Sequence, residues 1–256
     1  MKQAKVIAVA NHKGGVGKTT TVVSLGTILG KTHRVLLVDL DPQQSLTLSI
    51  LKDDPGEDNI YPSLIGNTNV LPILNAGNVD IVPSSLNLSL AEFQMVSMLA
   101  RERRLSDLLK PIKENYDYIF LDCPPSLGVL TLNALTAADK VIIPLIPELL
   151  PLKGLSTIED MVERIKKSLN PNLSISGILI TRSEQTKIHK TLEAKLRQQL
   201  GDMVFTSRIR KNISIAEAPT NKKGIVEYDP LSNGAADYTA FAKEFESRFE
   251  TNNNNK

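Results

Sequence analysis

The chain has 256 residues, of which 41% are hydrophobic and 23% are charged, and its formal net charge at pH 7 is +2. This composition matches that of soluble globular proteins and excludes the disordered and fibrous classes. The length lies within the range of single α/β domains, so we expect one domain over residues 1–250 and a disordered tail over 251–256. So small a net charge does not indicate nucleic-acid binding, which would need a local basic patch.

Cysteine content and apolar runs restrict where the protein can act. Cys123 is the only cysteine, which excludes an intramolecular disulfide framework and a cysteine cluster for zinc or iron–sulfur. The apolar run after Lys2 stops at Asn11 without a small-residue cleavage site, so it predicts a strand and not a signal peptide. No run of about 18 apolar residues is present, which excludes a membrane span. We therefore expect a cytoplasmic protein.

Short β-rich runs alternate with segments of helical period along the chain. Several of these runs are apolar throughout, as expected of strands that helices cover on both faces. The pattern predicts an α/β fold with a doubly wound, mostly parallel sheet, whose functional site lies at the carboxyl ends of the strands. The predicted strands are 6–10, 35–39, 80–83, 118–122, 141–145, 176–180 and 204–209.

Two amphipathic helices are predicted in the last third of the chain. Apolar residues recur every three or four positions in both, and the first helix ends at Gly201, which suits a C-cap. The stripes are Ile188, Leu192, Leu196 and Leu200 in the first helix, and Tyr238, Phe241, Phe245 and Phe249 in the second.

A glycine-rich loop follows the first predicted strand and opens a helical segment that runs to Gly30. Glycines let consecutive backbone N–H groups close around phosphate oxygens, and the start of a helix favours negative charge. In such a loop Lys18 reaches the β- and γ-phosphates, and the Thr19 hydroxyl binds Mg²⁺. The predicted nucleotide-binding residues here are Lys13, Gly14, Gly15, Val16, Gly17, Lys18, Thr19 and Thr20.

The loop departs from the general phosphate-loop pattern at one position. That pattern places a glycine where His12 stands, whereas here Lys13 precedes two glycines. The alternative is a glycine-rich turn that binds no ligand, but two lysines and two threonines in this context favour phosphate binding. We expect His12 itself to be a structural or surface residue.

Three acidic residues lie at the ends of two predicted strands. Asp39 ends the strand 35–39 and Asp41 follows it, while Asp122 ends the strand 118–122. Because the carboxyl ends of parallel strands meet at one edge of a sheet, these carboxylates should face the glycine loop, where they can hold Mg²⁺ through water or orient an attacking water. Alone, each could be only a turn or cap residue.

Together these segments resemble the ParA/Soj family of partition ATPases, within the ParA/MinD group with its deviant Walker A loop. The resemblance runs from the first strand almost to residue 249. It implies an ATPase that uses ATP and Mg²⁺, with Asp122 as the Walker B acid and Asp39 near Mg²⁺ through water. It also implies that Lys18 and Asp41 serve hydrolysis, and that Lys13 crosses to the partner's nucleotide in an ATP-sandwich homodimer.

The resemblance continues toward the C-terminus with three departures. The segment 209–219 resembles the family's adenine border, which implies that Arg210 and Pro219 bind the nucleotide. Arg210 replaces the usual proline, and Ser214 stands where many members have an arginine implicated in DNA contact. Gln44 and Ser45 replace the usual glycine and asparagine.

The resemblance further implies weak basal hydrolysis that a ParB-like centromere-binding adaptor stimulates. The ATP-bound dimer would hold non-specific double-stranded DNA on the nucleoid and so segregate plasmid or chromosomal DNA. Lysines and arginines near the second-last helix are the predicted DNA contacts. An ordinary solvated helix and charged loop are the alternative, since Glu184 and Glu193 interrupt the basic run. The predicted DNA-binding residues are Lys187, Lys190, Arg197, Arg208, Lys211 and Lys222.

Other members of the group provide alternative functions. A MinD-like protein would hold a membrane with a basic amphipathic C-terminal helix, but the last helix here mixes acidic and basic residues, so no membrane partner is expected. A nitrogenase-reductase-like protein would need a pair of cysteines, which the chain lacks. A cargo-positioning ATPase that acts as a nucleotide-switched binding module, without DNA partition, stays open.

Overall fold

The computed structural model describes residues 3–148 and 151–251. In this part of the chain one sheet has the strand order β3-β4-β2-β5-β1-β6-β7-β8, and every neighbouring pair is parallel except β3 with β4. The strands are β1 Lys5–Val9, β2 Val35–Asp39, β3 Leu74–Asn75, β4 Asp80–Val82, β5 Tyr118–Asp122, β6 Lys140–Leu145, β7 Ser174–Ser183 and β8 Val204–Arg210. The predicted α/β fold with a mostly parallel sheet is confirmed.

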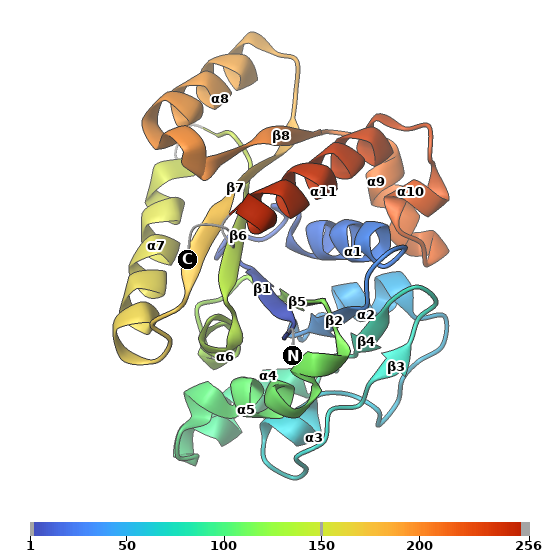
Figure 1. Ribbon diagram of the computed structural model, residues 1–256, viewed down its shortest axis with the longest axis vertical. Coiled ribbons are helices and arrows are strands. Elements are labelled where there is room, and N and C mark those ends of the chain that lie inside the picture. The colour runs from blue at the N-terminus through green and yellow to red at the C-terminus, as the bar shows by residue number, and fades with distance from the viewer. Residues whose placement is uncertain (1–2, 149–150, 252–256) are drawn as a thin grey trace.

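Helices cover both faces of the sheet (Figure 1). One hydrophobic cluster joins the sheet to α5, α6 and α7, and a second joins it to α1 and α11. The α-helices are α1 Lys18–Leu29, α2 Ser45–Ile50, α3 Tyr61–Leu64, α4 Leu88–Gln94, α5 Arg104–Leu109, α6 Val129–Ala137, α7 Pro151–Ser168, α8 Lys187–Leu200, α9 Ile213–Glu217, α10 Ile225–Tyr228 and α11 Asn233–Thr251. Short 3₁₀ helices are η1 Met95–Ser97, η2 Arg101–Arg103, η3 Lys110–Asn115, η4 Gly201–Met203 and η5 Ala218–Asn221.

The predicted stripe of α11 is buried, whereas that of α8 is buried only at Leu196 and half-buried at Leu192 and Leu200. The four aromatic residues of α11 lie in the core, and α8 ends at Gly201 with a φ of 51°. The prediction for Ile188 is wrong, because its side chain is 66% exposed. Ile188 lies in the first turn of α8, while the buried apolar contact of this helix is made farther along, at Leu196.

No helix in residues 3–148 or 151–251 combines the length and apolar character that crossing a bilayer requires. Thr251 ends α11, and the remainder of the predicted tail, 252–256, lies outside the described residues.

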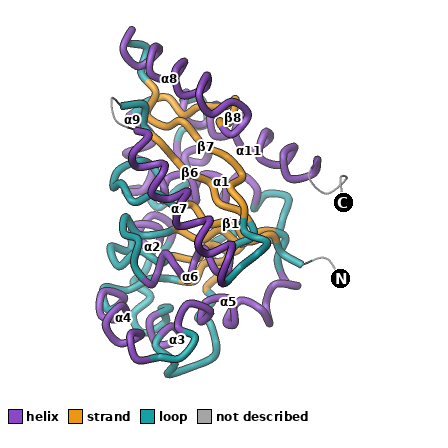
Figure 2. Tube along the Cα trace, turned by 90° about the vertical axis from the view of Figure 1, so that its left-hand side faces the viewer, coloured by secondary structure: helices purple, strands orange, loops and turns teal. Residues whose placement is uncertain are grey.

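Register at the centre of the sheet determines which side chains can meet. Asp122 at the end of β5 lies opposite Asp39 of β2 and Val9 of β1, so all three strands end at the same edge. The loops after these strands begin there, and α2, α4 and α9 lie along one side of the molecule, opposite the two termini (Figure 2). The glycine loop and the carboxylates therefore share one side of the molecule, as predicted.

Candidate functional site

The loop 13–20 has a backbone that requires glycine. Gly15 and Gly17 have φ values of 71° and 90°, which disfavour any residue with a Cβ. Beneath the loop, the buried hydroxyl of Thr181 at the end of β7 donates to the Val16 carbonyl at 2.8 Å. No atom lies within 4 Å of where a Cβ of Gly14 or Gly15 would stand. The loop is thus fixed from below and open above, as a phosphate cradle must be.

Lys18 begins α1 and folds back over this loop. Its Nζ donates to the Lys13 carbonyl at 3.0 Å, and the residue is only 7% exposed. Burial lowers the pKa of Lys18, while Asp122 and Asp41 act in the opposite direction. The Lys18 ammonium group therefore lies between the loop and the acidic edge of the sheet. Phosphate oxygens bound at the loop would place negative charge next to this buried positive charge.

Asp122 is completely buried, with few partners for its carboxylate. Neither of its carboxylate oxygens has a partner of normal geometry among the described residues. Burial, and then the neighbouring Asp39, raise its pKa well above the usual value, although the Thr19 hydroxyl and Lys18 lie near enough to oppose this. An unpartnered buried carboxylate destabilises the fold, and one beside a threonine hydroxyl suits a hydrated divalent cation.

Asp39 is also fully buried, but both of its oxygens accept hydrogen bonds. Oδ1 accepts from the Asp41 N–H at 3.1 Å, and Oδ2 accepts from the N–H and Oγ1 of Thr47 at 2.8 and 2.7 Å. Burial raises the pKa of Asp39 to about 6, against the effect of the Thr47 hydrogen bonds. Asp39 therefore holds the segment between β2 and α2, and its predicted place beside Mg²⁺ stays a prediction.

Asp41 lies in this segment, at the wall of a cleft. Its Oδ1 accepts from the Gln43 N–H at 2.9 Å, and its carbonyl accepts from the Ser84 hydroxyl at 2.7 Å. The Ser84 N–H in turn donates to Thr47 Oγ1 at 3.0 Å, which ties the segment to the end of β4. Gln44, where the family usually has glycine, has a left-handed φ of 58°.

The cleft has a volume of about 1210 Å³ and two chemically different ends. The polar end is formed by the glycine loop with Lys18, Thr19, Thr20 and Asp41. The other end is mainly apolar, and its lining includes Val23, Ile213, Ile215, Ala218, Pro219, Ile225 and Tyr238. Val16, Asp39 and Asp122 lie behind the wall and not in it. The space suits a ligand with an anionic end and a flat apolar end.

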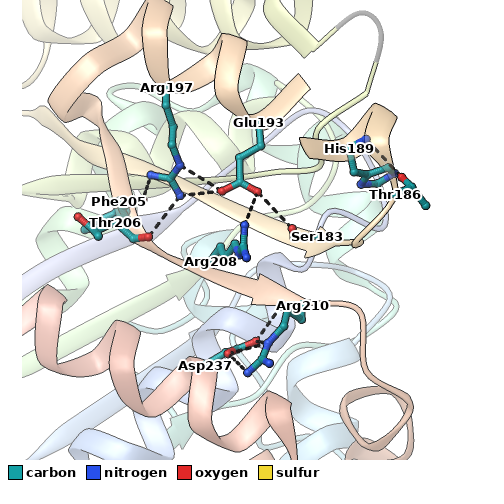
Figure 3. Close-up of polar contacts among 10 residues, drawn as sticks. All are labelled: Ser183, Thr186, His189, Glu193, Arg197, Phe205, Thr206, Arg208, Arg210 and Asp237. Atoms are coloured by element: carbon teal, nitrogen blue, oxygen red, sulfur yellow. Dashed lines mark hydrogen bonds and ion pairs between the residues drawn. The ribbon is translucent and has the colours of Figure 1, made fainter. Parts of the chain in front are cut away.

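Arg210 also lines the cleft, but its guanidinium is bound to Asp237 of α11 (Figure 3). Nε donates to both Asp237 oxygens at 2.9 and 3.1 Å, Nη2 donates to Oδ1 at 2.6 Å, and the backbone N–H donates to Oδ2 at 2.9 Å. Next to Asp237, the Tyr238 hydroxyl lies 3.4 Å from Thr21 Oγ1. Arg210 thus joins the apolar wall of the cleft to α11, a role that the sequence did not indicate.

Lys13 does not line the cleft of its own chain. Its Nζ forms an ion pair with Glu148, which follows β6, and both side chains are about half exposed. The Lys13 backbone N–H donates to Asn11 Oδ1 at 3.0 Å, which fixes the start of the loop. The ammonium group is therefore available to a second molecule.

Two of the predicted DNA contacts are bound within the fold (Figure 3). Glu193 of α8 is 6% exposed and accepts from Arg197 Nε and Arg208 Nη1, both at 3.1 Å, and from the Ser183 hydroxyl at 3.2 Å. Arg197 also donates to the Phe205 carbonyl at 2.8 Å and to the Thr206 carbonyl at 3.2 Å. These arginines neutralise a buried carboxylate, so both have a structural role.

The remaining predicted DNA contacts differ in whether their side chains are already bound to another residue of the fold. Lys211 pairs with Glu184 at 2.9 Å, and Lys222 donates to the Leu48 carbonyl of α2. Lys187 and Lys190 are exposed in the first turn of α8, and neither forms an ion pair within the described residues. The structure therefore brings two free cations together at the start of α8.

In the described part of the chain, no three His, Cys, Asp or Glu side chains are grouped to hold a metal by themselves. A cation near Asp122 would need oxygens from a ligand as well. Sequence reasoning missed Thr47, Thr181, Asp237 and Glu148, although Thr181 carries a usable signal because it directly follows a predicted strand.

Comparison with known proteins agrees with this geometry. The family described as AAA domain matches residues 4–175. The sporulation initiation inhibitor protein Soj of Bacillus subtilis is 44% identical over 94% of this chain and 97% of its own. The chromosome partitioning protein ParA of Myxococcus xanthus is 39% identical over 95% of this chain and 88% of its own.

The chain belongs to the ParA/Soj family.

In this chain the cleft forms around the glycine loop at the carboxyl edge of the sheet. Among solved structures, cobyrinic acid a,c-diamide synthase of Mycobacterium smegmatis with bound ATP analogue and magnesium superposes with a TM-score of 0.83. It is 31% identical to this chain, and the match covers 97% of each. A neighbour of similar fold and sequence thus binds an ATP analogue and magnesium.

Proposed function

We propose that this ParA/Soj family member is a partition ATPase of the cytoplasm that binds ATP and Mg²⁺, pairs two subunits around the nucleotides and holds non-specific DNA. A ParB-like adaptor stimulates its weak basal hydrolysis, which releases the DNA and segregates a plasmid or chromosome on the nucleoid. The observation that carries this proposal is Lys13, whose ammonium group leaves its own cleft and lies half exposed beside Glu148.

The cleft accommodates ATP with its two chemically different ends. The phosphates lie on the loop 13–20, and the base lies against the apolar wall near Pro219 and Arg210. The Thr19 hydroxyl and the unpartnered Asp122 carboxylate, through water, are the groups that would hold Mg²⁺. The ion supplies charge neutralisation at the phosphates.

Hydrolysis is assigned to residues around the polar end. Lys18 binds the β- and γ-phosphates, and the Asp41 carboxylate at the cleft wall orients the attacking water. Lys13 of one subunit adds positive charge to its partner's nucleotide only when the dimer forms. Association and catalysis are thereby coupled, and loss of the γ-phosphate releases the segment that Asp39 and Thr47 hold.

Asp41→Ala tests the catalytic assignment. We expect single-turnover phosphate release to fall by about 10- to 100-fold, since a water-orienting group is lost, while fluorescent ATP still binds within about threefold of the wild-type affinity. Asp53→Ala, an exposed loop aspartate, is the control and should leave turnover unchanged. A normal rate in Asp41→Ala would refute the role given to Asp41.

Lys13→Ala tests the dimer. With a non-hydrolysable ATP analogue and Mg²⁺, light scattering should show wild type as a dimer and Lys13→Ala as a monomer. Lys31→Ala, another exposed lysine, should behave as wild type. Equal dimerisation of Lys13→Ala and wild type would show that Lys13 does not act across the interface.

The alternative of a cargo-positioning ATPase has one observation in its favour. Ser214, where many family members have an arginine, donates its hydroxyl to Asp229 at 2.7 Å, and Arg197 and Arg208 are bound to Glu193. A MinD-like membrane role gains no such support. Glu244 and Arg248 of α11 are bound to β8 and the turn before it. Loss of DNA binding with intact ATP-dependent dimerisation would favour the cargo-positioning function.

A further inference from the structure

Helix α4 and the turns on either side of it carry apolar side chains that the described residues leave uncovered. We call this set the α4 stripe. It comprises Leu86, Leu90, Phe93, Val96 and Leu99, which are 65%, 50%, 79%, 64% and 98% exposed. Leu90, Phe93 and Val96 recur every three residues in α4 and η1 and so lie along one side of them, while Leu86 and Leu99 lie in the turns before and after. Contiguous exposed apolar surface of this kind marks an interaction site.

The opposite side of the same segment is apolar as well. Leu88, Ala91 and Met95 are fully buried against the core. A surface helix ordinarily pairs one apolar face with one charged face, whereas a helix that is apolar on both sides is covered on both sides. Residues 84–99 contain only one charged residue, Glu92, in a chain that is 23% charged. The segment therefore has the composition of a covered element.

The α4 stripe lies on the same side of the molecule as the nucleotide cleft. The segment begins at Ser84, which bonds the Asp41 carbonyl and Thr47, so it starts from the wall of the cleft. Glu92 packs directly over Gly128, which precedes α6 and follows the Asp122 strand. Figure 2 shows α4 along one side with α2 and α9, which border the cleft. A molecule that approaches the cleft opening with a broad flat surface would also meet α4.

A hollow next to the stripe can receive an apolar side chain. Its volume is about 320 Å³, and it lies between α4 with η1 and the start of α6. Val96, Leu127, Val129 and Leu132 provide its apolar lining, and Glu92 and Arg101 lie at its charged side. The stripe thus combines projecting side chains with a recess, which is what two copies of one surface need to interlock.

The charge of the segment decides among the candidate partners. DNA and anionic lipid surfaces are bound through lysine and arginine, and residues 84–99 contain neither. Glu92 is the single charged residue of this segment, so little charge opposes contact with an identical surface. In a two-fold symmetric contact the same patch serves both subunits, so an uncharged apolar patch is complementary to itself.

We propose that the α4 stripe packs against the same surface of a second copy of this chain when ATP pairs the subunits. This inference rests on the proposed function, because it extends the contact that the nucleotides and Lys13 make. In the proposed dimer, α4 provides the hydrophobic part of the interface, and Lys13 with the nucleotides provides the charged part. Ser84 connects α4 to the Asp41 carbonyl. Packing of the stripe would therefore also affect the segment between β2 and α2, which responds to the γ-phosphate in the proposed function.

The test is the double variant Phe93→Ser/Val96→Ser, with Leu231→Ser as its control. Leu231 is 96% exposed in the turn between α10 and α11, outside the stripe. Sedimentation velocity with a non-hydrolysable ATP analogue and Mg²⁺ should show dimerisation of the double variant weakened about 10- to 100-fold, as expected for two central apolar side chains. The control should match wild type.

Two further measurements separate this effect from misfolding or a defective cleft. The melting temperature of the double variant without nucleotide should equal or exceed that of wild type, because both side chains are exposed in the free subunit. Fluorescent ATP should bind dilute monomer with unchanged affinity. Both results together with weak dimerisation support the stripe as an interface between copies.

Other outcomes overturn the inference. If the double variant dimerises within about threefold of wild type, the stripe is not part of the dimer, while the proposed ATP-dependent dimer itself stands. If it dimerises normally but loses stimulation by a ParB-like adaptor, the adaptor and not a second copy covers α4. If wild type stays monomeric with the analogue, the dimer of the proposed function fails and this inference fails with it.

Discussion

Gln44 shows at the level of one residue how this chain departs from its family. Its φ of 58° is in the left-handed region, where a side chain costs about 1–2 kcal/mol that glycine avoids. The conformation persists because Asp39 and Asp41 accept N–H groups on either side of it, from Thr47 and Gln43. The usual glycine of the family therefore has a conformational reason, and this chain retains the turn without it.

Gln44→Gly should stabilise the protein. We expect the free energy of unfolding to rise by about 0.5–1 kcal/mol, because relief of the left-handed strain exceeds the entropy that glycine adds to the unfolded chain. Urea denaturation without nucleotide measures it. Gln44→Ala, which keeps the Cβ, is the matched control and should give no gain. If both variants behaved alike, the turn would not be strained at this residue.

The residues assigned to the proposed nucleotide site could be named from the sequence because their signal is local. The loop 13–20, Asp41 and Asp122 are each defined by a short motif at the end of a strand. Their supporting partners were not predictable, because the contacts join distant parts of the chain. Thr181 reaches Val16 across 165 positions, and although Thr181 follows a predicted strand, nothing in the sequence identifies Val16 as its partner.

At the level of elements, the edge strand β8 provides the partners of charged side chains on the last helix. An unpaired strand edge exposes N–H and carbonyl groups that invite further pairing. Here side chains occupy that edge. Glu244 accepts from the Thr206 and Ser207 N–H groups, both at 2.7 Å, and Arg248 donates to the Asp202 and Val204 carbonyls at 3.0 and 3.1 Å. The mixed charges of α11 therefore have structural partners.

Glu244→Gln should destabilise the fold in a pH-dependent way. Burial alone would raise the pKa of Glu244, but the N–H groups of Ser207 and Thr206 and the nearby Arg248 outweigh burial and lower it. A lowered carboxyl pKa contributes stability above the unfolded value of about 4.3 and loses it as the pH falls through the folded value. We expect a loss of about 1–2 kcal/mol at pH 7.

Urea denaturation at a series of pH values from 7 down to 3 checks this prediction. The difference between Glu244→Gln and wild type should shrink as the pH falls below about 4, where wild type also loses the carboxylate. Glu246→Gln, on the same helix, is the control and should show a smaller difference. A deficit that did not change with pH would mean that the carboxylate charge is not what secures β8.

Periodicity predicted the long elements and missed the short ones. All seven predicted strands exist, but β3 has only two residues and pairs antiparallel to β4, too short for any alternation to appear. Strand β7 runs through Ser174–Ser183, beyond the predicted 176–180, because it continues through irregular register against β8. Ile188 fitted the helical period, yet burial depends on where α8 meets the core, which periodicity does not determine.

For the whole molecule, charge must act locally, because the net charge is only +2. Arg197, Arg208 and Lys211 near α8 pair with acids, whereas Lys187 and Lys190 form an exposed pair that, like Lys195 farther along the helix, has no ion-pair partner in the described residues. A dimer presents this pair twice. Doubling a weak patch explains why DNA binding would depend on ATP, since a single copy offers few phosphate contacts.

Lys187→Ala/Lys190→Ala should therefore weaken ATP-dependent binding to double-stranded DNA of any sequence and reduce its salt dependence. Each lysine that contacts a phosphate contributes about 1 to the slope of log affinity against log salt, so the loss of slope measures the contacts removed. Lys166→Ala/Lys167→Ala removes the same charge from exposed positions at the end of α7 and should leave the slope unchanged. Equal slopes for both double variants would exclude the start of α8 as the DNA surface. Arg197→Ala should instead lower the melting temperature, because it leaves the buried Glu193 and the β8 carbonyls short of a donor.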